Sequence, residues 1–135
     1  MFNELLLIPA VAMGLLISIL EIIFVRQDER GMHWLTHGLH AVPTCVIFTL
    51  IAMNVPVVIE YLNIAFLQGT FATYAIPIGI GLVAAIKVKA AAALTRGGRI
   101  GESMHHALII GALIGASPFI WEYALADIVG PYLPF

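Results

Sequence analysis

Charged residues are scarce in this 135-residue chain, and their scarcity decides its class. Asp, Glu, Lys and Arg together make up 10% of the sequence, whereas hydrophobic residues make up 61%. A soluble domain carries about 25% charged residues. The composition is therefore that of an integral membrane protein, and the length suits a single membrane domain covering residues 1–135.

Cysteine and basic residues are also few, and each shortage excludes a class of function. Cys45 is the one cysteine, so the chain can form neither an internal disulfide nor a Cys-x-x-Cys redox pair. Six Lys and Arg residues in a chain of net charge −2 make no dense basic patch, which argues against a nucleic-acid partner. A phosphate-binding glycine loop, His-Glu-x-x-His and Gly-x-Ser-x-Gly are all missing, so the sequence gives no sign of those enzyme classes.

Long apolar runs dominate what is present. Four of them cover residues 5–25, 41–61, 71–90 and 105–129. Each is close to the roughly 20 residues that cross about 30 Å of hydrocarbon. Lipid offers no partner for backbone polar groups, so each run must be helical. The first run lacks the basic start of a signal peptide, and we expect it to be retained. The sequence thus predicts an all-α, four-helix membrane bundle.

The basic residues show which side of the membrane each connection occupies. All six lie at the first and third connections, and the second connection, residues 63–70, has none; they are Arg26, Arg30, Lys87, Lys89, Arg96 and Arg99. In a chain of four spans, the first and third connections share one side. The positive-inside rule places that side in the cytoplasm, with both termini extracytoplasmic, as in a multi-pass protein of the plasma or inner membrane.

A local pattern hints at an internal duplication. Pro-x-x-x-Glu-Tyr occurs at residues 56–61 and 118–123, and Ile-Pro occurs at residues 8–9 and 76–77. One interpretation is a tandem duplication of a two-helix hairpin, with the two repeats parallel and a central site between them. The alternative is that membrane spans share proline and tyrosine without common descent. The offsets between the paired motifs differ, so a duplication would need gaps.

Prolines inside the spans have a further local effect. Each removes one helix hydrogen bond and frees the carbonyl four residues earlier. In a bundle, such a carbonyl can face a cavity or coordinate an ion. The prolines concerned are Pro43, Pro56, Pro77 and Pro118, and the freed carbonyls are those of Leu39, Ala52, Thr73 and Ile114.

All five histidines fall in the predicted cytoplasmic layer. Residues 32–40, MHWLTHGLH, put three of them on one helical stripe, and Glu102-x-x-His105 follows the third connection. Carboxylate and imidazole ligands suit Zn²⁺, Mn²⁺ or Fe²⁺. The candidate ion or metal site comprises Glu21, His33, His37, His40, Glu102, His105 and His106. Glu21 lies inside its span and needs a partner such as Arg26, Lys89 or a histidine.

Two other interpretations of the histidines stay open. They suit an interfacial belt without chemistry, because imidazole is stable at headgroup depth. A haem site or a proton relay would instead need one histidine from each of two helices, such as His37 or His40 opposite His105 or His106.

Two more features belong to the second and fourth spans. Glu60 and Glu122 lie near their predicted outer ends, either as a carboxylate pair that attracts cations or as ordinary helix-end charges. Ala107, Gly111 and Gly115 recur every four residues and form a small-residue ridge, for packing within the chain or in a homodimer.

The sequence therefore favours a small transporter or channel for a cation or proton. The alternatives are a membrane-anchor subunit of a redox complex, binding haem or quinone through histidines, and a structural subunit without chemistry. The expected partners are the lipid bilayer and either further copies of the chain or other membrane subunits. A divalent metal is the cofactor that the candidate residues suit best, and haem is the alternative.

Overall fold

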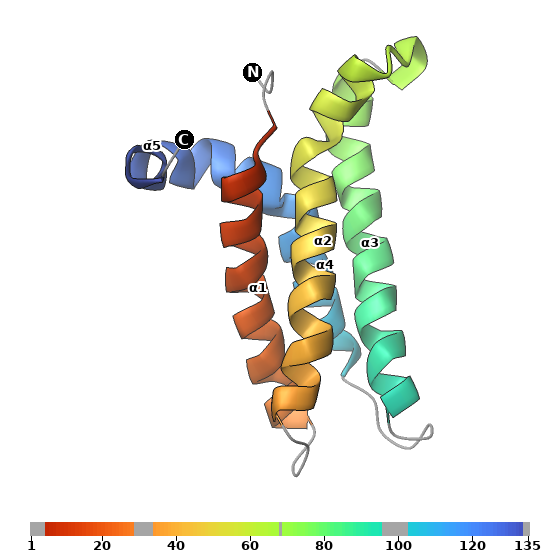
Figure 1. The fold of residues 1–135 in the computed structure, drawn as a ribbon. Helices are drawn as coiled ribbons and strands as arrows, with labels where there is room; N and C mark the ends of the chain where they lie inside the picture. Colours follow the sequence, from red (N-terminus) through yellow and green to blue (C-terminus); the bar gives the residue numbers. More distant parts are fainter. Residues whose placement is uncertain (1–4, 29–33, 68, 96–102, 134–135) are drawn as a thin grey trace.

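The chain forms four long helices that stand side by side (Figure 1). The computed structural model describes residues 5–28, 34–67, 69–95 and 103–133, and side chains for all of these except 34–38 and 91–95. The helices are α1 (Leu7–Asp28), α2 (Trp34–Tyr61), α3 (Thr70–Thr95) and α4 (Met104–Ile120). Four helical segments are long and apolar enough to cross a membrane, which confirms the predicted all-α bundle of four apolar helices.

The helices associate as two hairpins. α1 packs most extensively against α2, and α3 against α4, while α2 joins the two hairpins by contacting both α3 and α4. This is the arrangement that a duplicated hairpin would give, and the duplication itself stays a prediction. Both described ends of the chain lie at one end of the bundle, called here the termini end; the other is called the Asp28 end (Figure 1).

Close contacts between helix backbones hold each hairpin together. A Cβ atom built on Gly14 of α1 would lie 2.6 Å from the Val46 Cα of α2. In the second hairpin, a Cβ on Gly81 would lie 2.3 Å from the Gly111 carbonyl oxygen, and one on Gly115 would lie 3.0 Å from the Pro77 carbonyl oxygen. The ridge formed by Ala107, Gly111 and Gly115 is buried, and its two glycines pack against α3 within the chain.

Two apolar clusters fill most of the interior, one above the other. The cluster nearer the Asp28 end contains Ile17, Cys45, Ala52, Ala84, Val88, Ala107, Ile110 and Ile114. The cluster at the termini end contains Ala10, Met13, Met53 and Trp121. Burying side chains of this kind is worth about 25 cal/mol per Å² against water, but the neighbouring lipid is equally apolar, so close packing has to stabilise the bundle.

Polar side chains complete the helix ends and one proline site. Asn54 Oδ1 accepts a 2.7 Å hydrogen bond from the Leu6 N–H, which satisfies an amide that the start of α1 leaves free. The Ser117 hydroxyl donates at 2.7 Å to the Ile114 carbonyl, the one that Pro118 deprives of its usual N–H donor. That carbonyl is therefore engaged within its own helix.

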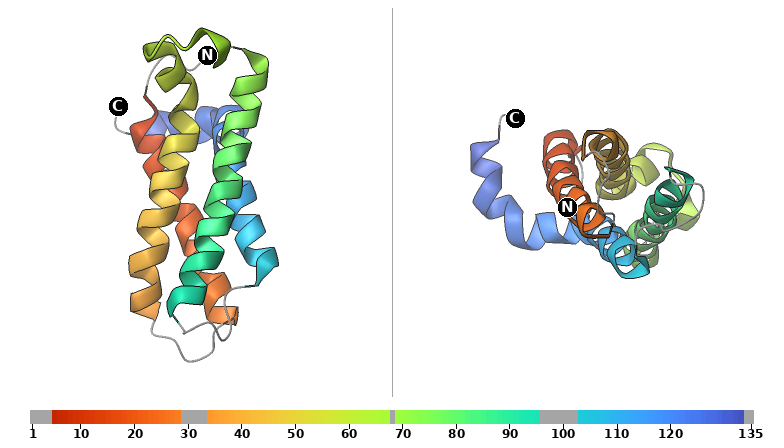
Figure 2. Two further views of the ribbon diagram at one scale, coloured as in Figure 1. Left: turned by 90° about the vertical axis from the view of Figure 1, so that its right-hand side faces the viewer. Right: turned by 90° about the horizontal axis from the view of Figure 1, so that it is seen from below.

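The fourth helix does not stay upright. After Ile120 it passes through a π-helical turn, η2 (Trp121–Leu125), and continues as α5 (Ala126–Val129) and the 3₁₀ turn η3 (Gly130–Tyr132). These residues run across the bundle and wrap the outside of α1 (Figures 1 and 2). We call residues 121–132 the lateral segment. The sequence predicts a fourth span to residue 129; the candidate spanning segment reaches Tyr132, and α4 itself ends at Ile120.

Candidate functional site

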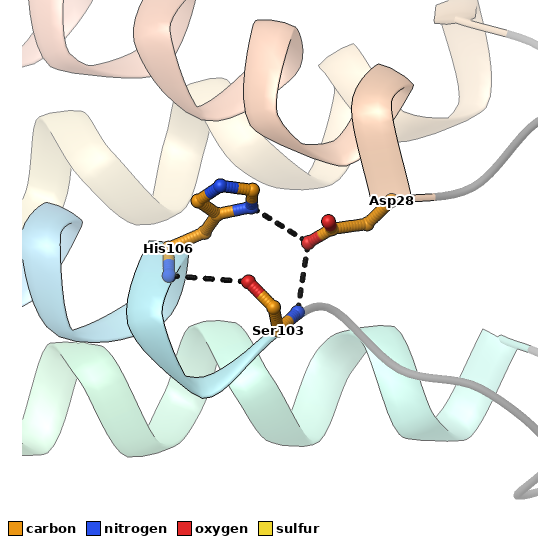
Figure 3. Close-up of polar contacts among 3 residues, drawn as sticks. All are labelled: Asp28, Ser103 and His106. Atoms are coloured by element: carbon orange, nitrogen blue, oxygen red, sulfur yellow. Dashed lines mark hydrogen bonds and ion pairs between the residues drawn. The ribbon is translucent and has the colours of Figure 1, made fainter.

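A carboxylate, a histidine and a helix N-terminus meet at the Asp28 end of the bundle (Figure 3). Asp28 Oδ2 accepts two hydrogen bonds: one from His106 Nδ1 at 2.7 Å and one from the Ser103 backbone N–H at 2.8 Å. Ser103 is the N-cap of α4, and its hydroxyl accepts from the His106 N–H at 3.4 Å. The cluster thereby ties the last residue of α1 to the first turn of α4.

Each part of this cluster has a local physical cause. Serine is favoured at the N-cap because its hydroxyl accepts one of the amide hydrogens that the first helical turn leaves free. The positive end of the α4 dipole stabilises a carboxylate there by about 0.3–1 kcal/mol. Asp28 and His106 are mostly shielded from water, with side chains 16% and 21% exposed, so their charge-assisted hydrogen bond is only partly weakened by solvent.

The orientation of the His106 ring is fixed on two sides. Phe24 stacks on it with ring centroids 4.2 Å apart and an angle of 8° between the planes. Because Nδ1 faces a carboxylate, we assign the proton of the neutral ring to Nδ1, which leaves Nε2 as the acceptor nitrogen. A carboxylate that holds one imidazole nitrogen in this way prepares the other nitrogen to take up a proton or to bind a metal.

Glu21 lies on the same face of α1 as Asp28, deeper in the bundle. Seven residues are two helical turns, so the two carboxylates are about 10 Å apart in height and project in nearly the same direction. Glu21 is 5% exposed, and Ser18, one turn further in, is also buried. An ionisable side chain inside a membrane span is costly, and such residues usually mark a pathway for ions or protons.

Two buried hydroxyl side chains, those of Thr49 and Ser117, lie among the residues of the apolar clusters. Thr49 is four residues from Cys45 and three from Ala52 in one cluster and four from Met53 in the other, and Ser117 lies three residues after Ile114 and four before Trp121. Thr49 and Ser117 are both fully buried. No described residue offers a hydrogen-bond partner to Thr49 Oγ1. The interior therefore holds a hydroxyl oxygen that the described residues leave without a hydrogen-bond partner.

The other residues of the candidate ion or metal site are spread out or lie outside the described residues. His40 and His105 are exposed at the surface. For His37, only the backbone, within α2, is described; His33 and Glu102 lie outside the described residues. Among the side chains that are described, no three of the types His, Cys, Asp and Glu lie close enough to hold a metal ion. The seven-residue metal or ion cluster therefore stays a prediction.

The outer carboxylates stand on different elements. Glu60 is exposed near the end of α2, and Glu122 is half-buried in the lateral segment. The end of α2 bends toward α3, whereas the lateral segment runs past α1 on another side of the bundle (Figure 2). A pairing of these two side chains also stays a prediction.

Sequence reasoning named His106 but missed the residues that hold it. Ser103 had a usable signal, because serine directly before an apolar helical run is a typical N-cap. Asp28 and Phe24 gave no comparable signal, since their contacts with α4 depend on how two distant helices pack.

Comparisons with protein-family models, with curated proteins and with solved structures gave no match.

Proposed function

We propose that this chain carries protons or a small cation across a membrane through the interior of its helical bundle. The main support for the proposal is the burial of Glu21, an acidic residue that is only 5% exposed within a candidate membrane span. Placing an ionisable group at such a depth costs several kcal/mol, and ionisable residues inside membrane spans usually mark a pathway for ions or protons.

The other buried polar residues extend from Glu21 in one direction along the bundle. Ser18 and Gly14 follow at intervals of one turn on α1, and the Gly14–Val46 contact sets the register with α2. On that register, Thr49 lies about 15 Å above Glu21 in height. Thr49 therefore lies about 25 Å above Asp28, toward the termini end, and offers a buried polar group on the far side of the interior from the Asp28 cluster.

The Asp28 cluster would form the entrance. Its acceptor nitrogen, His106 Nε2, can exchange protons with the adjacent aqueous phase, and Glu21 stands two turns above Asp28. Ser18, Glu21, Thr49, Asn54 and Ser117 are the buried polar residues among those described. This set holds one carboxylate and no Lys or Arg, and such an interior favours cations over anions.

The described conformation would be a closed one. Met13, Met53 and Trp121 fill the termini end of the interior, and apolar constrictions of this kind exclude water and ions. Transport would require this cluster to open.

The test is ion flux into liposomes that hold the purified protein. We expect protons or potassium to enter faster than they enter protein-free vesicles under the same gradient, and we expect chloride to be excluded. Flux equal to that of protein-free vesicles for every cation tested would reject the proposal and leave a structural subunit as the better account. A Soret band in the purified protein would instead favour the haem-binding alternative.

A further inference from the structure

The lateral segment has two faces of different character. Its inner face packs on α1 and α2: Trp121 belongs to the cluster with Ala10, Met13 and Met53, and Leu125, Ala126 and Val129 pack against that cluster. No described part of the chain covers its outer face, which presents apolar and aromatic side chains; Tyr123, Ile128 and Tyr132 are 69%, 66% and 86% exposed. The segment is therefore helical, fixed on one side and uncovered on the other.

Two independent lengths give the height of this segment in the bundle. Along α1, eighteen residues separate Asp28 from Ala10, which is about 27 Å at 1.5 Å per residue. Along α4, the 17 upright residues before the turn span about 25 Å. The hydrocarbon core of a bilayer is about 30 Å thick. If the charged Asp28 cluster marks one boundary of the hydrocarbon, the lateral segment lies at the other boundary.

The side chains near the turn suit that depth. Just before the turn, the ring of Phe119 in α4 stacks on that of Tyr74 in α3, with ring centroids 5.1 Å apart. Tyr123 lies within the π-helical turn itself. Aromatic residues gather in belts where hydrocarbon meets headgroups. Glu122 and Asp127 also belong to the segment, and carboxylates at this level can reach the aqueous phase.

We infer that the lateral segment lies in the plane of the membrane, in the interface of the leaflet nearest the termini, with lipid covering its outer face. The four spans also expose large apolar side chains, such as Ile19 and Leu82, so the outer face of the segment has the same apolar character as the outside of the bundle. In-plane helices sit with their apolar face about 5–10 Å into the boundary between headgroups and acyl chains. Residues 121–132 hold no Lys or Arg, so apolar packing rather than attraction to anionic lipid keeps the segment there.

The hairpin between α2 and α3 would extend beyond the level of the lateral segment. Asn54 stands level with the start of α1, because it bonds the Leu6 amide. α2 continues for seven more residues to Tyr61, which is about 10 Å. That tip would cross the headgroup layer and place Glu60 in water.

Spin labels can test this placement in the full-length protein. Single cysteines would replace Tyr123, Ile128 and Tyr132, one at a time, in a Cys45→Ala background in liposomes. Matched references would be Ile19→Cys, an exposed position in the middle of α1, and Glu60→Cys at the hairpin tip. Collision rates with dissolved oxygen, which concentrates in hydrocarbon, and with a water-soluble nickel chelate report the depth of each label.

The expected result is a ratio of oxygen to nickel collisions that lies between those of the two references at all three positions. A ratio equal to that at Glu60→Cys would put the segment in water, and a ratio equal to that at Ile19→Cys would put it in the hydrocarbon core. Low collision rates with both reagents would mean that a second protein copy covers the face. Each of these three outcomes would overturn the inference, and none depends on whether the protein transports ions.

Discussion

At the scale of single residues, the hydrogen bonds of Asp28 join the end of α1 to the start of α4. Replacing His106 with alanine leaves the Asp28 carboxylate with one donor in place of two and removes the ring that stacks on Phe24. A partly buried charge that loses a hydrogen-bond partner destabilises a fold by about 1–3 kcal/mol. We expect His106→Ala to lower the free energy of unfolding by this amount, measured by denaturation in detergent micelles.

His105 is the matched control for that measurement. It is the adjacent residue in the same helical turn, and its side chain is exposed. An exposed substitution normally changes stability by no more than about 0.5 kcal/mol. If His105→Ala and His106→Ala were equally damaging, the loss would reflect the helix start and not the Asp28 contact.

The residues around this contact are the ones that could least be predicted from the sequence. Histidines and carboxylates could be assigned to one layer because helical spacing and span order fix height along the bundle. Which of them touch depends on helix rotation and on the approach of residues more than 70 positions apart, as with Asp28 and His106. Nothing local in the sequence encodes that approach, so the pair was not predicted.

Glycine packing between α3 and α4 is the main feature at the scale of single elements. Gly81 and Gly79 belong to the same helix but differ in surroundings: a Cβ on Gly81 would lie 2.3 Å from the Gly111 carbonyl oxygen, whereas one on Gly79 would meet nothing within 4 Å. We expect Gly81→Ala to separate the helices and lower stability by about 1–3 kcal/mol.

Gly79→Ala should instead raise the stability of the protein. Alanine is favoured over glycine inside a helix by about 0.8–1 kcal/mol, and at Gly79 nothing opposes it. Thermal unfolding of the two variants side by side tests both expectations. A loss of stability in Gly79→Ala as large as that in Gly81→Ala would mean that glycine flexibility, and not close packing, is what α3 requires.

The direction of the fourth helix shows the limit of sequence reasoning for elements. Hydropathy predicted four helical segments because each run is apolar and long enough. It did not predict the turn at Trp121, because the residues stay helical on both sides and the change of direction is set by burial of Trp121 against Met13 and Met53. The inner partners come from α1 and α2, which no local pattern in residues 118–129 reveals.

Orientation in the membrane is a property of the whole molecule. The positive-inside rule predicts that the Asp28 end is cytoplasmic and that the α2–α3 connection is outside. Gln27→Cys and Glu60→Cys are exposed positions at the two ends of the bundle, and the native Cys45 is fully buried. We expect a membrane-impermeant maleimide added to intact cells to label Glu60→Cys and to spare Gln27→Cys.

Cell lysis supplies the control for that experiment, since both cysteines should then react. The wild-type chain, with Cys45 alone, should stay unlabelled in intact cells. Labelling of Gln27→Cys in intact cells, with Glu60→Cys protected, would reverse the predicted orientation and exchange the entrance and exit of the proposed pathway.

Transport through the bundle interior depends most on Glu21, so its carboxylate gives the most direct test. Glu21→Gln keeps the shape of the side chain and removes its charge, and Glu60→Gln makes the same chemical change at an exposed position. Proton entry into liposomes under an imposed pH gradient is the measurement. We expect Glu21→Gln to bring the rate down to that of protein-free vesicles and Glu60→Gln to keep most of the wild-type rate. Equal rates for wild type and Glu21→Gln would contradict a pathway through Glu21.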